Sequence, residues 1–467
     1  MGKLFGTDGI RGTANKSLTG ELAYRVGVAV ASVLTHDLEH GRARVLIGKD
    51  TRLSGYMLGH ALAAGLCAGG CDVTMLGVAP TPAVAYLTVY NGFDAGIVIS
   101  ASHNAYEDNG IKIFNSKGFK LSDELEADIE RVALSYNLPL ADGAEIGKMY
   151  SEHERSLTEY IEHLRTFAEP QRRRLRIAVD CANGAAYKTA ETVFSPLASK
   201  LYVVHDRPNG FNINEQCGST APESLMREVL AQRCDIGFAF DGDADRCIVV
   251  DERGQIIDGD KIMAIIAEHM QSHGTLARDT IVATTYSNLG LSEYAAERGM
   301  RVLQASTGDR NVLELMQKEG ANFGGEQSGH LIFLDDATTG DGQLAALKFL
   351  AAVAASGKTA SALADKIAMY PQELVNVPLD AEVNAETLMY SAPVVDAIDA
   401  AERELGFRGR VLVRPSGTER KLRIMVEAPT SEQAVRLSSE IARAVESAIS
   451  KSTGNSDSST VLQLPAH

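Results

Sequence analysis

Short runs of apolar residues alternate with longer amphipathic segments along most of the chain. Continuous apolar runs are typical of strands buried on both faces of a parallel sheet, and amphipathic segments of this length are typical of helices. We therefore predict a helix over 55–68. The predicted strands span 44–48, 72–76, 96–100, 175–180, 200–205, 235–240, 280–285 and 301–305. Repeated strand–helix–strand units indicate mostly parallel sheets covered by helices.

This alternation divides the chain into blocks, and the pattern of apolar and amphipathic segments changes after Pro371. We predict three α/β domains of similar architecture, with mixed sheets, over 1–152, 153–257 and 258–370. A smaller α+β domain over 371–449 is predicted from strands at 373–379, 410–414 and 421–428 and helices at 390–405 and 431–449. The Ser-rich segment 450–467 has no periodicity and is predicted to be a disordered tail.

The net charge of −16 argues against a role in binding nucleic acid or anionic lipid, because a field of that sign repels both. No apolar run approaches the length of a membrane helix, and the N-terminus lacks the apolar region of a secretory signal. We expect a cytoplasmic protein without a membrane or nucleic-acid partner. The six cysteines are sparse, and Cys67, Cys181, Cys234 and Cys247 lie in or beside apolar stretches. They are expected to be buried, reduced thiols.

The first candidate site follows the predicted strand 96–100, where the sequence continues Ser100-Ala101-Ser102-His103-Asn104. Ligands in open α/β sheets bind at the carboxyl ends of strands, so a Ser–His pair there is well placed for chemistry. The hydroxyl of Ser102 could act as a nucleophile or phosphate carrier, with the imidazole of His103 moving its proton. The alternative is an ordinary turn that caps the strand.

The second candidate site consists of Asp241, Asp243 and Asp245, which alternate directly after a predicted strand. Three carboxylates this close are difficult to keep ionised without a cation, so the pattern indicates a hard divalent metal. An EF-hand is excluded because Arg246 occupies the position that must be glycine and the flanking segments are predicted strands. A solvated acidic turn is the remaining alternative.

Two further loops have residues suited to polar ligands, one to sugar hydroxyls and the other to an anion such as phosphate. Glu326, Ser328 and His330 lie between glycines and suit sugar hydroxyls, although a polar hairpin would explain them equally well. A later loop contains the anion-binding set Arg414, Ser416, Gly417 and Thr418, with further basic residues Arg420, Lys421 and Arg423. Its alternative is a basic hairpin tip. Near the N-terminus, Arg11 lies between two glycines, in what is either a ligand-binding loop or a simple turn.

These five loops occur together and in this order, and the chain resembles the α-D-phosphohexomutase superfamily, within it the bacterial phosphoglucosamine mutases. The resemblance extends to about residue 449. It is carried also by FGTDGIRG at 5–12, GKDTRLSGYML at 48–58, PTPAVAYL at 80–87, DCANGA at 180–185, NGFNIN at 209–214 and TTGDG at 338–342. It implies four domains around a central cleft, and a monomer or homodimer.

The resemblance also implies a role for each candidate residue. Ser102 would carry a phosphoryl group, and this group with Asp241, Asp243 and Asp245 would bind one Mg²⁺. The substrate contacts would be Arg246, Glu326, Ser328, Arg414, Ser416, Gly417, Thr418 and Arg423. Arg11, His103, Lys112 and His330 would surround the reacting hydroxyl.

The implied reaction interconverts glucosamine 6-phosphate and glucosamine 1-phosphate through a hexose 1,6-bisphosphate, for UDP-N-acetylglucosamine synthesis. The same chemistry on glucose or mannose is the nearest alternative, since the site residues do not distinguish these sugars. A non-catalytic phosphosugar-binding protein is another alternative, and a metal-dependent phosphatase fits the loops poorly. Two residues depart from the family pattern: Ala105 and Arg420 stand where the family usually has proline. We expect altered rates from them, not lost chemistry.

Overall fold

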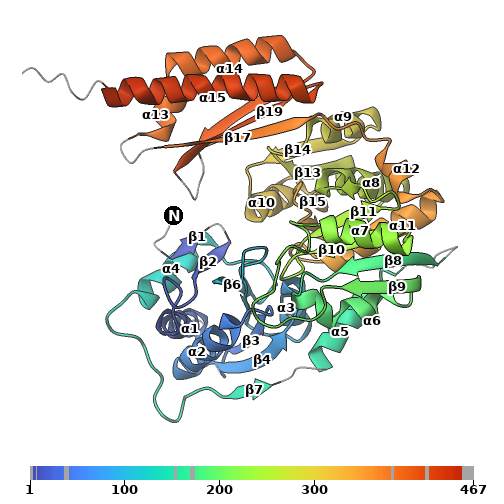
Figure 1. The fold of residues 1–467 in the computed structure, drawn as a ribbon. Coiled ribbons are helices and arrows are strands. Elements are labelled where there is room, and N and C mark those ends of the chain that lie inside the picture. The colour runs from blue at the N-terminus through green and yellow to red at the C-terminus, as the bar shows by residue number, and fades with distance from the viewer. Residues whose placement is uncertain are drawn as a thin grey trace, which may run out of the picture. The chain divides into compact units, whose positions relative to one another are not determined.

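The computed structural model describes residues 4–6, 8–35, 41–151, 155–168, 174–379, 383–415 and 420–454. The chain forms two compact units (Figure 1). The larger comprises Met1–Ser287 and Ala295–Ile367, and the smaller comprises Asn288–Tyr294 and Ala368–His467. Three sheets that mix parallel and antiparallel strands lie in the larger unit, and an antiparallel sheet lies in the smaller one. The predicted fold class is confirmed, while the expected central cleft stays a prediction.

The first sheet has seven strands in the order β1-β2-β6-β5-β3-β4-β7. They are β1 (Phe5–Gly6), β2 (Gly9–Thr13), β3 (Arg44–Lys49), β4 (Asp72–Val78), β5 (Ala95–Ile99), β6 (Asp108–Asn115) and β7 (Met149–Ser151). Its helices are α1 (Gly20–Thr35), α2 (Ser54–Ala68), α3 (Thr81–Tyr90) and α4 (Asp123–Ala133). Along β3, Ile47 packs in the core under α1 and α2, whereas Gly48 faces Val84 of α3, so helices cover both faces.

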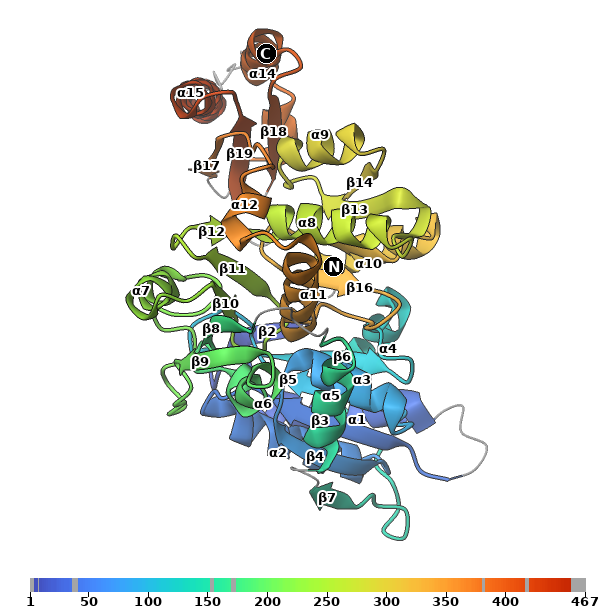
Figure 2. The same ribbon diagram turned by 90° about the vertical axis from the view of Figure 1, so that its right-hand side faces the viewer.

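The second and third sheets have five and four strands, in the orders β12-β11-β10-β8-β9 and β14-β13-β15-β16 (Figure 2). The second contains β8 (Leu175–Asp180), β9 (Ala198–Val204), β10 (Ile236–Phe240), β11 (Cys247–Asp251) and β12 (Ile256–Ile257). The third contains β13 (Thr280–Thr284), β14 (Arg301–Ala305), β15 (Phe323–Gly325) and β16 (Leu331–Phe333). The surrounding helices are α5 (Arg155–Arg165), η1 (Ala185–Lys188), α6 (Ala190–Phe194), α7 (Glu223–Gln232), α8 (Gly259–Ser272), η2 (Ala277–Asp279), α9 (Leu289–Glu297), α10 (Asp309–Glu319), α11 (Gly342–Ser356) and α12 (Ala360–Ala364).

The smaller unit has the antiparallel sheet β17-β19-β18, with β17 (Gln372–Pro378), β18 (Arg410–Pro415) and β19 (Lys421–Glu427). Its helices are α13 (Ala385–Met389), α14 (Ala392–Leu405) and α15 (Ser431–Gly454). The predicted start of the disordered tail at Ser450 is wrong, because α15 continues to Gly454. Ser450 there donates to the carbonyl of Glu446, one helical turn earlier. The rest of the predicted tail, 455–467, lies outside the described residues.

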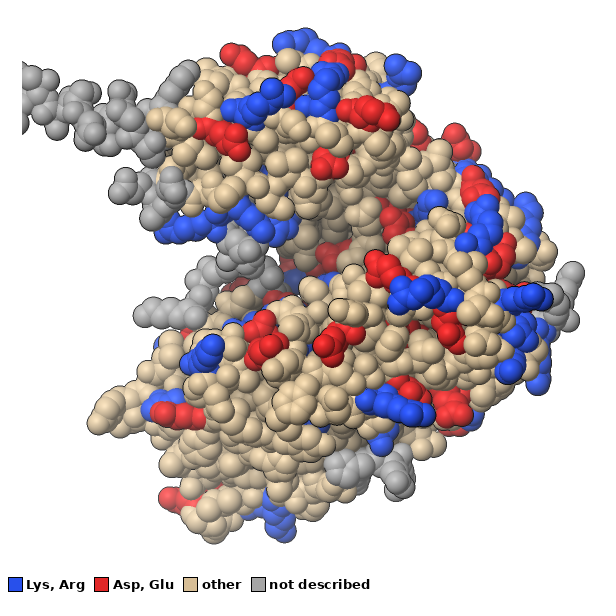
Figure 3. Space-filling view, in the orientation of Figure 1, with Lys and Arg blue, Asp and Glu red and all other residues tan. Residues whose placement is uncertain are grey.

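The cysteine prediction is largely confirmed. All six cysteines are free thiols, and Cys181, Cys234 and Cys247 are buried, while Cys67 is partly exposed. None of the helices in the described ranges is long and apolar enough to span a membrane. On the face shown in Figure 3, acidic and basic side chains are interspersed over the larger unit, and basic side chains gather along one edge of the smaller one.

Candidate active site

Three of the predicted loops occupy the same topological position in successive sheets. Each connects a strand that has one parallel neighbour to the antiparallel strand on its other side: β5 to β6, β10 to β11 and β15 to β16. Ser102 lies in the first connection, Asp241, Asp243 and Asp245 in the second, and Glu326 in the third. All three loops belong to the larger unit.

The serine loop is held by a buried network. Ser102 has a left-handed backbone conformation, with φ of 52°, and its amide donates to Ser100 Oγ at 2.9 Å. Ser100 Oγ in turn donates to Asp50 Oδ2 at 2.6 Å. Asp50 also pairs with the fully buried Arg52, whose guanidinium donates to the carbonyls of Ser102 at 2.9 Å and Asn104 at 2.8 Å. The strained conformation of Ser102 is therefore fixed by surrounding groups.

Ser102 and the aspartate loop meet directly. Ser102 Oγ donates to Asp241 Oδ2 at 2.6 Å, although the two residues are 139 positions apart in the chain. Asp241 and Asp243 are fully buried, and Asp245 is nearly so. Ligand atoms of the three aspartates lie within 4.8 Å of one another. Ser102 and the acidic triad thus form one site.

Lys112 is the main counter-charge of the triad. Its Nζ lies 2.9 Å from Asp243 Oδ2 and 3.3 Å from Asp245 Oδ2. Burial opposes the charge of Lys112, but Asp243, Asp8 and Asp245 together raise its pKa well above the usual range. Burial and the neighbouring carboxylates raise the pKa of Asp241, whereas Lys112 and His330 overcome burial and lower the pKa of Asp245. The two pKa values shift in opposite directions because Asp245 faces Lys112 and His330, whereas Asp241 is buried beside the other two carboxylates.

The triad also has the properties of a divalent-cation site. Asp243 Oδ1 and Asp245 Oδ1 are buried oxygens with no hydrogen-bond partner among the described residues. A hard cation such as Mg²⁺ binds carboxylate oxygens and would satisfy both atoms. The residues present therefore fit a magnesium ion bound by the triad.

Histidines flank this site on two sides. His103 Nδ1 lies 3.4 Å from Ser102 Oγ, and burial, with Arg246 and Arg11, lowers the pKa of His103 to about 4. His330 Nδ1 lies 3.6 Å from Asp245 Oδ1. Burial disfavours the charged form of His330, but Asp245 and the other nearby carboxylates raise its pKa to about 9. One imidazole is therefore neutral and the other cationic near neutral pH.

The remaining predicted residues of the larger unit lie around the same loops. Arg246 donates its amide to Asp241 Oδ1 at 3.2 Å, and Arg11 pairs with Asp8. Asp8 also pairs with Lys112, 3.3 Å from its Nζ. Glu326 accepts a hydrogen bond from Ser328 Oγ at 3.3 Å. These contacts connect Arg246 to the triad, and Arg11 through Asp8 to Lys112.

The predicted phosphate loop belongs to the smaller unit. Arg414 of β18 pairs across the sheet with Arg423 of β19, so two basic residues share one position of the hairpin. Ser416, Gly417 and Thr418 lie outside the described residues. The proximity of this loop to a bound substrate stays a prediction.

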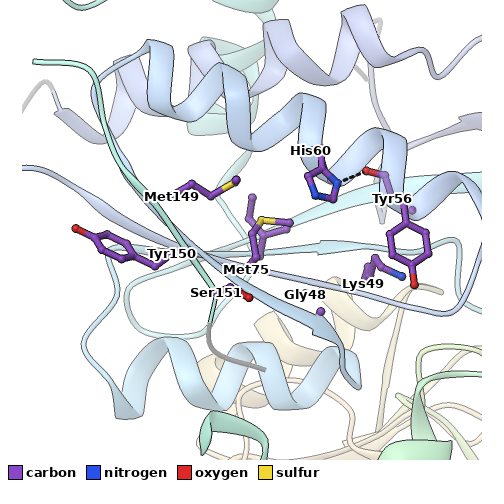
Figure 4. A pocket seen from close by; sticks show the side chains of 12 residues that line it. Gly48, Lys49, Tyr56, His60, Met75, Met149, Tyr150 and Ser151 are labelled. Carbon is purple, nitrogen blue, oxygen red and sulfur yellow. Dashed lines mark hydrogen bonds between the residues drawn. The ribbon is translucent and has the colours of Figure 1, made fainter. Parts of the chain in front are cut away.

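A separate pocket of about 360 Å³ lies in the first α/β domain (Figure 4). It is lined by Lys49, Tyr56, His60, Met75 and Met149 with neighbouring residues, and Lys49 Nζ lies 3.8 Å from the centroid of the Tyr56 ring. None of the predicted site residues lines it, so the pocket is distinct from the candidate active site.

Family models match nearly the whole chain, domain by domain. The models describe phosphoglucomutase/phosphomannomutase, with α/β/α domain I at residues 2–138, domain II at 158–254, domain III at 258–370 and the C-terminal domain at 374–444. The chain belongs to the phosphoglucomutase/phosphomannomutase family. This membership confirms the predicted enzyme class, a phosphohexomutase isomerase, and the predicted resemblance.

Curated relatives support a narrower group within the family. A phosphoglucosamine mutase of Desulforamulus reducens is 48% identical over 430 residues, which cover 91% of this chain and 95% of the relative. Among solved structures, a phosphoglucomutase/phosphomannomutase family protein of Burkholderia thailandensis matches with a TM-score of 0.76 and 27% identity, covering 95% of this chain and 97% of the other. An Aspergillus fumigatus N-acetylphosphoglucosamine mutase, in complex with GlcNAc-6P and magnesium, has the same fold, with a TM-score of 0.66, 18% identity and 96% of each chain covered.

Sequence reasoning missed several residues that support this family site. Asp50 and Arg52 lie in the GKDTR segment, but their role in holding the serine loop was not predicted. Asp50 directly follows a buried strand, which is the same signal that identified Ser102 and Asp241. Thr81 Oγ donates to Asp243 Oδ2 at 2.7 Å, and Asn214 Nδ2 donates to the carbonyl of Ser102 at 2.9 Å. No local pattern marks these two contacts, because their partners are more than a hundred residues away.

Proposed function

We propose that this protein interconverts glucosamine 6-phosphate and glucosamine 1-phosphate through a phosphoserine enzyme and a 1,6-bisphosphate intermediate. The observation that carries the proposal is the contact of Ser102 Oγ with Asp241 Oδ2, at 2.6 Å, at the edge of a buried carboxylate triad. The choice of an amino sugar rests on the relatives named phosphoglucosamine mutase. The product would supply UDP-N-acetylglucosamine synthesis.

The reaction consists of two phosphoryl transfers. Phospho-Ser102 gives its phosphoryl group to the C1 hydroxyl of glucosamine 6-phosphate, so that the P–Oγ bond breaks as a P–O1 bond forms. His103, 3.4 Å from Ser102 Oγ, carries the proton of the attacking hydroxyl to that oxygen. The resulting 1,6-bisphosphate reverses its orientation. Its 6-phosphoryl group then returns to Ser102: the P–O6 bond breaks, a P–Oγ bond forms, and the proton of Ser102 Oγ passes to O6. Glucosamine 1-phosphate then leaves, and added hexose 1,6-bisphosphate can load the serine.

Asp241, Asp243 and Asp245, together with the phosphate on Ser102, would hold one Mg²⁺. When bound, this ion would offset negative charge on the transferring group. Lys112 contacts two of the three aspartates and would keep the triad compact and oriented. Positioning and electrostatic complementarity therefore supply most of the catalysis.

The other predicted residues would bind the sugar and its second phosphate. Glu326 and Ser328 accept and donate hydrogen bonds and suit sugar hydroxyls. Arg11 and His330 would place positive charge near the sugar hydroxyl that reacts, and Arg246 would contact the phosphoryl group during its transfer. The distal phosphate would be bound by Arg414, Ser416, Gly417, Thr418 and Arg423.

We assign the four domains to 1–152, 153–257, 258–370 and 371–449, and propose a cytoplasmic enzyme that is a monomer or a homodimer. Family members with the same site act on different hexoses, so phosphomannomutase or phosphoglucomutase activity is the second candidate. The intact Ser102 and aspartate triad argue against a non-catalytic phosphosugar-binding protein.

The substrate assignment is tested by comparing kcat/KM for the 6-phosphates of glucosamine, glucose and mannose, after priming with hexose 1,6-bisphosphate and Mg²⁺. The proposal expects the highest value for glucosamine 6-phosphate. A preference for glucose or mannose would keep the mechanism and overturn the amino-sugar assignment. If the protein turns over none of the three sugar phosphates, both the mechanism and the amino-sugar assignment are wrong.

A further inference from the structure

A second cluster of metal-ligating side chains lies in the second α/β domain and plays no part in the proposed reaction. It consists of Asp180, His205 and Cys217, whose ligand atoms lie within 4.8 Å of one another. Asp180 ends β8 and His205 directly follows β9, while Cys217 belongs to the segment before α7. Because β8 and β9 are parallel neighbours, their carboxyl ends bring Asp180 and His205 to one edge of the sheet.

The carboxylate of the cluster is held in place by backbone amides, and a histidine nitrogen faces it. The amides of Ala182 and Gly218 donate to the two oxygens of Asp180, at 2.8 and 2.9 Å, and fix the carboxylate. His205 Nδ1 pairs with Asp180 Oδ1 at 3.0 Å, so the nitrogen and the carboxylate oxygen already lie at the spacing of two ligands of one ion. Cys217 Sγ is fully buried and receives a long contact of 3.9 Å from Asn183 Nδ2.

We propose that Asp180, His205 and Cys217 form a second divalent-cation site, selective for Zn²⁺ or an ion of similar softness. Oxygen, nitrogen and sulfur together are a typical zinc ligand set, whereas Mg²⁺ prefers the all-oxygen triad of the active site. Tetrahedral zinc with these ligands has ligand-to-ligand distances of roughly 3.3–3.6 Å. The 3.0 Å distance from His205 Nδ1 to Asp180 Oδ1 is near this value, and Cys217 Sγ lies within 4.8 Å of a ligand atom of each of the other two residues.

Binding is a ligand exchange with one proton released. The Sγ–H bond of Cys217 breaks, a bond from the metal to Sγ forms, and the proton passes to solvent. The proton that His205 Nδ1 directs at Asp180 moves to Nε2 of the same ring through solvent, which frees the Nδ1 lone pair for the metal. Water completes the fourth position. The side chain of His205 is 30% exposed, so the ion has a route into the cluster from the surface.

An ion at this cluster would also stabilise the loops that hold the catalytic serine. The carbonyl of Ala182 accepts from the amide of Asn214 at 2.9 Å, and Asn214 Nδ2 holds the carbonyl of Ser102. The carbonyl of Asn183 accepts from Thr51 Oγ at 2.6 Å, which links the cluster to the first domain. Metal binding is therefore expected to raise the melting temperature of the protein.

The test titrates the full-length protein with Co²⁺ as a spectroscopic probe, in the presence of excess Mg²⁺. Magnesium occupies the aspartate triad, which has no sulfur, so a thiolate-to-cobalt charge-transfer band reports binding to a cysteine, and the cysteine variants show which one. We expect the band to saturate at one ion per chain and to disappear when Zn²⁺ is added. It should be absent in Cys217→Ser and unchanged in Cys234→Ser, which alters another buried cysteine.

His205→Gln provides a second variant, because a partly exposed side chain is replaced without disturbing the core. It should bind Co²⁺ roughly tenfold or more weakly than the unaltered protein. The absence of a charge-transfer band in the unaltered protein would overturn the proposal. A band that persists in Cys217→Ser, or an unchanged affinity in His205→Gln, would do the same.

Discussion

At the scale of single residues, the buried Arg52 does most to shape the serine loop. Its guanidinium donates to backbone carbonyls on both sides of His103, and its charge is balanced by Asp50. The chemistry of Ser102 and of the aspartates could be predicted because each directly follows a buried strand. The role of Arg52 could not, because its acceptors are backbone carbonyls about fifty residues away, which carry no sequence signature.

Replacing Arg52 by Lys should weaken both stability and catalysis. Lysine retains the charge but cannot direct several N–H groups to separate carbonyls. We expect the free energy of unfolding to fall by roughly 3 kcal/mol and kcat to fall roughly 10- to 100-fold. Urea denaturation and steady-state kinetics measure the two effects.

A matched control is Arg253→Lys, since Arg253 pairs with Asp365 on the surface. Solvent screens this exposed pair, so its loss should have little effect on stability. If Arg52→Lys were as stable and active as Arg253→Lys, the positioning role of Arg52 would be wrong.

The aspartate triad should respond to metal removal in a characteristic way. Without a cation the three carboxylates repel one another, so Asp241→Asn should be as stable as the metal-free protein or more so. Saturating Mg²⁺ should stabilise the unaltered protein by about 2.7 kcal/mol at one hundred times its Kd. The variant should gain much less.

Melting temperatures with EDTA and with Mg²⁺ test this prediction. EDTA should also abolish turnover, and added Mg²⁺ should restore it. Equal stabilisation of both proteins by Mg²⁺ would contradict the assignment of Asp241 as a ligand.

At the scale of elements, the fold repeats one strand–loop–strand connection. The buried first strand of this connection could be predicted from sequence, whereas the antiparallel strand that follows the loop could not. Continuous apolar runs predicted strands such as β3 and β8 closely. The antiparallel pairing of β5 with β6 (Asp108–Asn115) was not foreseen, because β6 carries polar residues such as Lys112 that face the site. Functional demands there override the apolar pattern that marks a buried strand.

Helix α11 begins at a cap with an unusual protonation behaviour. The side chain of Asp341 accepts from the amides of Gln343 and Leu344, both at 3.0 Å, and from the hydroxyl of Tyr160 at 2.8 Å. Burial outweighs these hydrogen bonds and raises the pKa of Asp341 to about 6. The folded protein therefore holds a proton there that the unfolded chain has already lost.

This difference gives a pH dependence with a definite sign. Between about pH 4 and 6 the folded state binds more protons than the unfolded state, so stability from this group falls as the pH rises. Relative to Asp341→Asn, the unaltered protein should lose about 3 kcal/mol of unfolding free energy between about pH 4 and 7. Urea denaturation of both proteins across this range measures it. A stability difference that does not change with pH would contradict the raised pKa.

At the scale of the whole molecule, ion pairs connect the domains of the larger unit. Lys120, just after β6, pairs with Asp8 and with Asp309 at the start of α10. Asp8 also pairs with Arg11 and Lys112, and Asp309 lies 3.6 Å from His330 Nε2. The four-domain division followed from periodicity, but these pairs between distant segments could not be predicted from it.

Replacing Lys120 by Gln should therefore affect both stability and activity. The carboxylates of Asp8 and Asp309 would lose a shared cation, at a cost of roughly 3 kcal/mol. Since Asp8 and Asp309 also contact Arg11, Lys112 and His330, kcat should fall together with the stability. Denaturation and kinetics measure both effects.

Lys366→Gln is the matched control, because Lys366 pairs with Glu268 within the third domain, with both side chains partly exposed. It should change stability by about 1 kcal/mol or less and leave kcat unchanged. Equal effects of the two substitutions would contradict a special role for the pair that joins the domains.

The central claim is that Ser102 carries the phosphoryl group. The most direct measurement is mass spectrometry of the protein and its peptides after incubation with glucose 1,6-bisphosphate and Mg²⁺. We predict one phosphoryl group per chain, located on Ser102, and neither phosphorylation nor turnover in Ser102→Ala. A phosphoryl group on another residue, or a Ser102→Ala variant that turns over at the normal rate, would contradict the account.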